Sequence, residues 1–206
     1  MTLHLKKSLS LIPTLLLFIS VSVLAQRPVP VTISVFNEAT ALPFTKLITI
    51  PVHPGLQLGT EFNYRERAST RLFQTANLCY FYHHHLNQGI GIFSELGYEY
   101  RLPAGFAFTG LFGLGYLHTW ATAEEFTFSN GQYEQRADLG NARLFPSLSL
   151  DIGYYIKREN ITGPKIFLRY QSWIEFPYSP GFIPVMTHIN FHLGLKFFML
   201  THKTQQ

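Results

Sequence analysis

Two adjoining stretches, residues 90–101 and 106–120, alternate between bulky apolar side chains and glycine, small or polar ones. A period of two places successive side chains on opposite faces of a β-strand. Strands of soluble proteins are usually about five or six residues long, whereas a tilted strand needs about nine to eleven residues to cross a bilayer. Both stretches are long enough, and the turn Leu102–Gly105 joins them, so we expect a long antiparallel hairpin.

The same alternation recurs along the rest of the chain. The first segment is the shortest and contains Pro30, which cannot donate a backbone hydrogen bond to a neighbouring strand. With it, the sequence predicts eight strands: Val29–Phe36, Leu56–Tyr64, Thr70–Tyr82, Ile90–Arg101, Phe106–Trp120, Leu144–Lys157, Lys165–Phe176 and Met186–Phe198.

The connections between these segments alternate between long and short. The long ones include residues 37–54, 83–88, 121–143 and 177–184, and the short turns lie between them. Bacterial membrane barrels have long external loops and short periplasmic turns, and an even strand number leaves both ends of the barrel in the periplasm. Within the longest connection, Asn130-Gly131 predicts a β-hairpin that projects beyond the membrane.

Alternation alone does not decide which face points outward, because a soluble ligand-carrying barrel has its apolar face inside and a membrane barrel has it outside. Charged residues make up 14% of the chain and aromatic residues 16%, whereas soluble domains average about 25% charged residues. There are too few charges to cover a water-facing barrel. We therefore expect the apolar face to contact lipid, and a secreted soluble barrel carrying an apolar ligand is the alternative.

The N-terminus has the features of a secretory signal peptide. Lys6 and Lys7 precede an apolar segment that ends at Val23-Leu24-Ala25, which predicts cleavage after Ala25. This gives a signal peptide over 1–25, a barrel over 26–200 and a polar tail over 201–206. Cleavage removes two of the sixteen basic residues, and fourteen against twelve acidic ones leave a net charge of +2. No basic run suggests a nucleic-acid partner, and a single cysteine, Cys79, excludes an intramolecular disulfide.

Together these features resemble a small eight-stranded outer-membrane barrel of diderm bacteria. The resemblance covers essentially the whole mature chain and includes an aromatic C-terminal strand with Phe191, Phe197 and Phe198. In this chain, residues 199–206 follow the last aromatic residue, whereas many such barrels end on it. The resemblance implies an all-β fold, a transmembrane antiparallel up-and-down barrel in the bacterial outer membrane, surrounded by outer-membrane lipid and monomeric.

The inward face of this barrel collects charges of both signs. The interior of an eight-stranded barrel is only wide enough for side chains to fill it, and an unpaired buried charge costs several kcal/mol. We expect these groups to pair across the lumen, with a narrow conducting pore as the alternative. The predicted network comprises Glu61, Arg71, Glu95, Glu99, Arg101, Asp151, Arg169, Glu175 and Lys196.

Aromatic residues are expected at both ends of the barrel. Tyrosine and tryptophan prefer the headgroup level, where the ring is sheltered and the polar edge meets water. One predicted belt lies near the short turns and contains Tyr64, Tyr98, Tyr100 and Tyr154, together with Phe106 and Phe108; the other lies near the long loops and contains Tyr80, Tyr82, Tyr116 and Trp120.

Catalytic residues are not evident. Lipid A deacylase barrels resemble this chain in size and carry a His-x-Ser pair, but the triplets here are His118-Thr119-Trp120, His188-Ile189-Asn190 and His192-Leu193-Gly194. A Ser–His–acid set from distant positions stays open: Ser149 or Ser172, His188 or His192, and Asp151 or Glu175. His188 and His192 are about 13 Å apart along one strand at ~3.3 Å per residue, too far to share a proton, so both are expected to fill the lumen.

The run His83-His84-His85 is the one candidate metal motif. Three consecutive residues at a strand end point to alternate sides and do not converge easily on one ion, so we expect a solvated loop, no metal site and no cofactor. The sequence thus predicts a structural or surface-interaction barrel whose external loop 122–141 faces a ligand or protein. A membrane-embedded lipid hydrolase or acyltransferase is the rival function.

Overall fold

The computed structural model describes residues 29–46, 49–84, 86–122, 125–129, 131–136, 138–157, 163–179 and 181–199. The predicted signal peptide, residues 1–25, and the predicted tail, residues 201–206, lie outside this part of the chain. No helix in the described part is long and apolar enough to cross a membrane.

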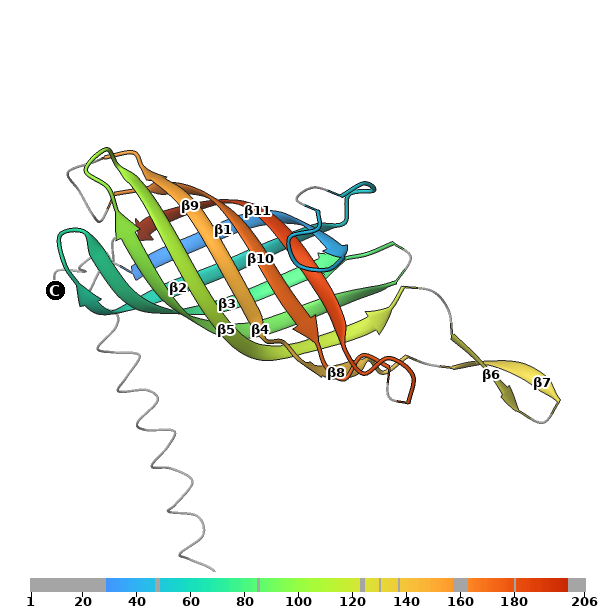
Figure 1. The fold of residues 1–206 in the computed structure, drawn as a ribbon. Helices are drawn as coiled ribbons and strands as arrows, with labels where there is room; N and C mark the ends of the chain where they lie inside the picture. Colours follow the sequence, from blue (N-terminus) through green and yellow to red (C-terminus); the bar gives the residue numbers. More distant parts are fainter. Residues whose placement is uncertain are drawn as a thin grey trace, which may run out of the picture.

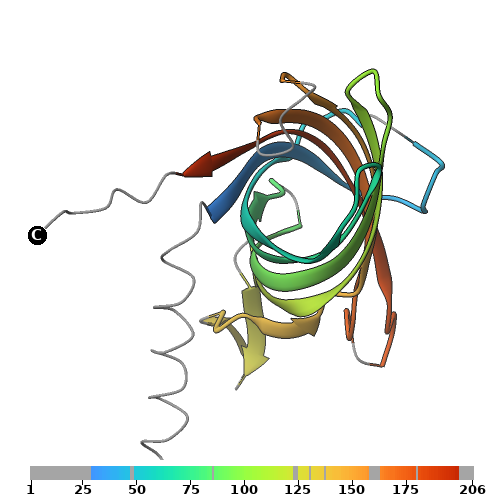
Figure 2. The ribbon, with the colours of Figure 1, turned by 90° about the vertical axis from the view of Figure 1, so that its left-hand side faces the viewer.

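Eight long antiparallel strands close into one barrel, as the alternation predicts (Figures 1 and 2). Each strand pairs with the next along the wall, and the first pairs with the last, so that Val29 lies opposite Met199. Both ends of the barrel segment are therefore at the same end of the cylinder, here called the inner end. The wall contains β1 (Val29–Thr40), β2 (Pro54–Glu66), β3 (Thr70–Tyr82), β4 (Asn87–Arg101), β5 (Phe106–Ala121), β9 (Ser147–Tyr155), β10 (Lys165–Glu175) and β11 (Met186–Met199).

Three short strands belong to the connection between β5 and β9. Strands β6 (Glu125–Ser129) and β7 (Gln132–Arg136) pair with each other in a separate two-stranded sheet, as the Asn130-Gly131 signal predicts. Gly131 has a φ of 81°, a left-handed conformation that glycine adopts at no steric cost. Figure 1 shows this hairpin projecting beyond the end of the barrel opposite the inner end, here called the outer end.

The predicted sixth strand, residues 144–157, is interrupted. Only its first residue belongs to β8 (Asn141–Leu144), which begins before the predicted strand, and β9 covers Ser147–Tyr155; both strands pair with β5. The break falls at Phe145-Pro146, because proline has no N–H to donate to the ladder. Phe145 turns into the barrel, where only 1% of its surface is exposed.

Two more predicted boundaries are wrong by three residues or more. The first strand does not end at Phe36 but continues to Thr40, because residues 37–40 keep pairing with β11. The connection predicted as a long loop over 83–88 occupies only residues 83–86, the same length as the turn 102–105 at the inner end. The alternation of long and short connections therefore fails between β3 and β4.

The two faces of the wall have opposite chemistry. Alternate residues are buried and exposed along β4, β5 and β9. The exposed positions carry large apolar side chains, such as Ile92, Phe112 and Ile152 at 62%, 67% and 56% exposure. The buried positions include glutamate, aspartate, arginine and lysine. The apolar surface is on the outside and the ionic groups are inside, as predicted for a barrel in lipid.

Candidate functional site in the barrel lumen

The part of the lumen nearest the inner end is organised around Glu99 of β4, which is fully buried. Its carboxylate accepts hydrogen bonds from Arg101 Nε at 2.7 Å and Lys165 Nζ at 2.7 Å. It also accepts one from the Tyr155 hydroxyl at 2.8 Å and lies 3.3 Å from Nη2 of Arg71. Four strands thus converge on one carboxylate, which compensates its desolvation.

A second carboxylate, Glu61, extends this inner cluster. It pairs with Arg71 across the β2–β3 ladder and lies 3.3 Å from Nζ of Lys196 on β11. Arg101 also reaches Glu66 at 3.2 Å near the end of β2. The cluster therefore joins strands from both sides of the seam at which the barrel closes.

In the middle of the lumen, the guanidinium of Arg169 is shared by two carboxylates. Arg169 donates to Asp151 through Nε and Nη2 and to Glu95 through Nη1 at 3.1 Å. Glu95 also accepts a hydrogen bond from the Ser149 hydroxyl at 2.9 Å. These four side chains are matched as donor to acceptor, which is the requirement for burying them.

Between the middle layer and the outer end of the barrel lies a cluster of apolar side chains, here called the plug. Phe145 makes edge contacts with Phe93 and Trp173 at centroid distances of 4.8 and 4.7 Å. Trp173 also donates its Nε1–H to Asn190 at 3.0 Å. Side chains from β1, β3, β4, β5, β10 and the β8–β9 break form this plug: Phe36, Cys79, Phe81, Phe93, Leu117, Phe145 and Trp173.

The outer mouth holds a further set of charges. His188 lies between two carboxylates, with Nδ1 2.7 Å from Oε1 of Glu38 and Nε2 3.3 Å from Oε2 of Glu175. The guanidinium Nε of Arg143 lies 3.0 Å from Oε1 of Glu175. The ring of His188 stacks on Trp173 at 4.0 Å, so this set rests directly on the plug.

The nine residues predicted to fill the lumen all lie inside it, distributed over these layers. Glu61, Arg71, Glu99, Arg101 and Lys196 are in the inner cluster, Glu95, Asp151 and Arg169 are in the middle, and Glu175 is at the mouth.

Four further charged participants were missed. Lys165 lies on the same inward face of β10 as Arg169, so the alternation alone was sufficient to predict its place in the lumen. Glu66 and Arg143 lie where the prediction had a turn and a loop, and Glu38 falls in the segment wrongly assigned to a connection.

The serines, histidines and acids considered for catalysis are assembled only in part. His188 meets Glu175, but Ser149 contacts Glu95 and Ser172 belongs to the outward face of β10. The serine beside His192 is Ser34, whose hydroxyl lies 3.1 Å from Nδ1, and Nε2 of this histidine faces the amide oxygen of Gln171. His188 and His192 are both buried.

His83 is buried rather than solvated, contrary to the prediction for the run at 83–85. Its ring stacks on that of His53 at a centroid distance of 3.5 Å, and 9% of His83 is exposed. His53 comes from the connection between β1 and β2, and no local pattern links the two positions.

The residues predicted as aromatic belts lie outward at the two ends of the wall. Tyr98, Tyr100 and Tyr154 adjoin Phe106 and Phe108 on neighbouring strands near the inner end. Near the outer end, Tyr80 and Tyr116 bond to Gln88 and His118 through their hydroxyls at 2.9 and 2.8 Å. Tyr64 also faces outward, whereas Tyr82, Trp120 and Tyr154 are only partly exposed.

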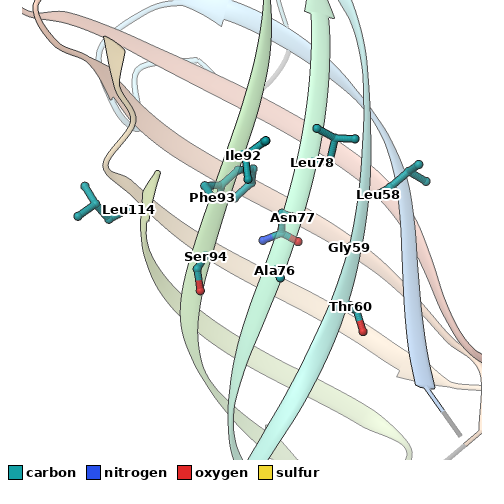
Figure 3. A pocket seen from close by; sticks show the side chains of 10 residues that line it. All are labelled: Leu58, Gly59, Thr60, Ala76, Asn77, Leu78, Ile92, Phe93, Ser94 and Leu114. Atoms are coloured by element: carbon teal, nitrogen blue, oxygen red, sulfur yellow. The ribbon is translucent and has the colours of Figure 1, made fainter. Parts of the chain in front are cut away.

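A shallow hollow of about 620 Å³ lies on the wall at β2, β3 and β4 (Figure 3). Its floor has small outward residues, Thr60, Ala76 and Ser94, between Leu58, Leu78 and Ile92. The pairing of β3 with β4 is interrupted here without a change of register, and the Ser94 hydroxyl donates to the Thr75 carbonyl at 2.7 Å. The lining also includes two inward residues, Asn77 and Phe93, of which Asn77 donates a hydrogen bond to Glu95 in the lumen at 3.2 Å.

No protein-family model matches the sequence, and no curated protein matches it by sequence. Among solved structures, the crystal structure of Neisserial surface protein A is similar at 7% identity, covering 83% of this chain and 96% of that chain with a TM-score of 0.51. The outer membrane enzyme PagL matches at 12% identity over 82% and 98% with a TM-score of 0.47. Ail of Yersinia pestis matches at 13% identity over 84% and 99% with a TM-score of 0.47.

These similarities concern the fold. A closed antiparallel barrel of eight strands, with an apolar exterior and an ionic lumen, is the architecture that the alternation predicts. The chain therefore has the fold of a small outer-membrane β-barrel.

Proposed function

We propose that this protein is a non-enzymatic, non-conducting barrel of the bacterial outer membrane that presents its external loops to a protein partner. The exposed apolar wall supports its residence in lipid, because the hydrocarbon core accepts a closed barrel and excludes unpaired backbone groups. Within this proposal, the outward tyrosines at the two ends form the belts at the two membrane surfaces.

The observation that carries the non-conducting role is the filled lumen. Along β10, Lys165, Arg169, Trp173 and Glu175 take part successively in the inner cluster, the middle layer, the plug and the outer mouth. All four are buried. An ion passing through would have to displace paired charges and then an apolar plug, and both steps are costly.

Among the external connections, the hairpin β6–β7 is best suited to contact with a partner protein. Phe128 and Tyr133 are 64% and 76% exposed, and their rings make an edge contact at 5.2 Å. The two strands pair only with each other among the described residues, so the outer backbone edge of each is available for a further strand. Exposed aromatic pairs are typical of the centres of protein interfaces.

Planar-bilayer recording tests the non-conducting role. The purified mature chain, inserted into a lipid bilayer beside a channel-forming porin as a positive control, should give no discrete current steps. Reproducible single-channel steps from the folded barrel would support a pore and contradict this part of the proposal.

Site-specific photo-crosslinking on intact cells tests the role of the hairpin. A photoreactive phenylalanine analogue replaces Phe128 or Tyr133, and the same analogue at Phe182 is the control, since that residue is 82% exposed in the neighbouring loop. The hairpin positions should give a discrete protein adduct that the control lacks. No adduct from either hairpin position, or the same adduct from Phe182, counts against the hairpin as the contact site.

A further inference from the structure

Three buried side chains at the outer mouth have the composition of a transition-metal site. Glu38 of β1, His53 before β2 and His83 after β3 each provide a potential ligand atom, and these atoms all lie within 4.8 Å of one another. Their exposures are 1%, 8% and 9%. Three segments that are separate in the sequence thus bring their donor atoms to one place.

The orientation of the His53 ring is fixed by a backbone atom. Its Nδ1 lies 3.1 Å from the carbonyl oxygen of Glu38, an atom that only accepts, so Nδ1 carries the proton. Nε2 is then the nitrogen with the free lone pair, and it is buried without a hydrogen-bond partner. Histidines that bind metals commonly donate their other ring N–H to a backbone carbonyl in this way.

The carboxylate of Glu38 likewise has one atom with a hydrogen-bond partner and one without. Oε1 is held by Nδ1 of His188 at 2.7 Å, while Oε2 is buried and has no hydrogen-bond partner. A buried carboxylate oxygen without a partner is costly, and such atoms in a structure call for an explanation. Two of the three residues in the cluster, Glu38 and His53, thus each have a buried ligand atom without a hydrogen-bond partner.

Hydrogen bonds to backbone atoms fix the position of each of the three residues. Glu38 N donates to the carbonyl of His53 at 2.9 Å, and His53 N donates to the side chain of Asn37 at 2.7 Å. His83 N donates to the carbonyl of Asn87 at 2.9 Å, and the carbonyl of His83 accepts from Thr122 at 2.8 Å. The donor atoms are therefore positioned by the wall and not by free loop tips.

We propose that Glu38, His53 and His83 bind one divalent transition-metal ion of the zinc class at the outer mouth. Two imidazoles and one carboxylate suit zinc and disfavour magnesium or calcium, which prefer oxygen ligands. Ligand atoms of a tetrahedral site with bonds of about 2.1 Å are about 3.4 Å apart. Closing the cluster around the ion therefore requires the stacked rings of His53 and His83 to turn so that both planes meet at the ion. A fourth position is left for water.

The charges of the mouth leave the second oxygen of Glu38 available to a cation. Both ring nitrogens of His188 face carboxylate oxygens, so His188 and Arg143 together balance Glu38 and Glu175 without occupying that oxygen. A bound ion would tie the β1–β2 connection to the end of β3 and close the outer mouth. This site goes beyond the proposed function and does not depend on the hairpin β6–β7.

Zinc binding to the untagged, folded mature chain in detergent tests the proposal. Isothermal titration should show one Zn²⁺ per chain with no competition from Mg²⁺ or Ca²⁺, and Co²⁺ should give the visible absorption of a four-coordinate site. His53→Gln, His83→Gln and Glu38→Gln should each weaken Zn²⁺ binding by about 100-fold or more, since even the loss of a supporting contact costs about 10- to 100-fold.

The matched control is His84→Gln, which removes the neighbouring imidazole and should leave Zn²⁺ affinity unchanged. Heat-dependent migration on gels verifies that each variant is a folded barrel. Absence of Zn²⁺ binding to the folded wild type overturns the proposal without reference to any variant. Wild-type affinity in folded His53→Gln and His83→Gln, or an equal loss in His84→Gln, assigns binding to other residues and also overturns it.

Discussion

Arg169 and Asp151 lie directly opposite each other on β10 and β9 and form a two-point ion pair inside the barrel, with N–O distances of 2.7 and 2.9 Å. Planar pairing of a guanidinium with a carboxylate is among the strongest side-chain contacts in proteins. Because Arg169 also serves Glu95, removal of this one cation leaves two buried acids without their main partner.

Replacement of that cation is the first prediction. Arg169→Met should lower the free energy of unfolding by about 3–5 kcal/mol, because one member of a buried ion pair is lost while its partners stay buried. Adding Asp151→Asn and Glu95→Gln should recover part of the loss. Urea unfolding in lipid vesicles, followed by tryptophan fluorescence, measures both.

The control for this prediction is Arg65→Met, because Arg65 is exposed at the end of β2. This change should shift the free energy by no more than about 0.5 kcal/mol. Equal, small effects of the two substitutions would show that the lumen pairs contribute little to stability.

Two glycines of β5 give a second prediction. Gly115 lies against Phe93, and a methyl group there would overlap the Phe93 side chain and the carbonyl oxygen of Ile92. Gly115→Ala should therefore destabilise the barrel by about 1–3 kcal/mol through overpacking. Gly110→Ala, on the same strand with open space at the Cβ position, should stay within about 0.5 kcal/mol. The urea midpoints of the two variants are compared. A larger loss of stability in Gly110→Ala than in Gly115→Ala would contradict the inward position of Gly115 against Phe93.

A third prediction concerns the connection after β1. The backbone N–H of Phe44 donates to the hydroxyl of Tyr170 at 2.8 Å, and the two rings stack at 5.2 Å, so this segment packs on the outer wall of β10. Tyr170→Phe removes the hydrogen bond, which contributes about 1 kcal/mol, and should speed protease cleavage within residues 41–46 about fivefold. Tyr100→Phe, near the opposite end of the barrel, should leave cleavage unchanged. Unaltered cleavage in Tyr170→Phe would mean that the hydroxyl does not hold the segment.

A fourth prediction places a charge on the apolar exterior. Leu150 is 51% exposed on β9, facing away from the lumen. Leu150→Arg should cost about 2–4 kcal/mol in a lipid bilayer, as charges do near the bilayer midplane. Leu139→Arg, in the loop at 86% exposure, is the comparison and should have little effect. A tolerated arginine at position 150 in vesicles would argue that this face meets water.

The strands were predictable because an eight-stranded membrane barrel imposes one rule on every wall residue. Glu95 and Arg169 occupy inward positions by parity alone, and the same parity sends Leu150 outward. The interior is too narrow for water to solvate these charges separately, so their pairing followed from barrel size. The identity of each partner did not follow, because register depends on how the wall closes.

Residues outside the alternation were not predictable in this way. Glu38 follows Asn37 in a segment that reads as polar loop, and only its pairing with β11 makes it part of the wall. Its neighbours His53 and His83 come from two other connections, so no spacing in the sequence brings the three together. The break at Pro146 carried a local signal, since proline interrupts a ladder, but the inward turn of Phe145 needs the barrel around it.

The central claim is that the apolar face contacts acyl chains while the ionic face is enclosed. The most direct measurement is collision of spin labels with oxygen and with a water-soluble nickel chelate in lipid vesicles, using Phe112→Cys and Leu139→Cys in a Cys79→Ser background. A label at position 112 should collide more with oxygen, which concentrates in the bilayer, and a label at position 139 should collide more with the chelate. Stronger collision with the chelate at position 112 would show that this face is exposed to water and would contradict the account.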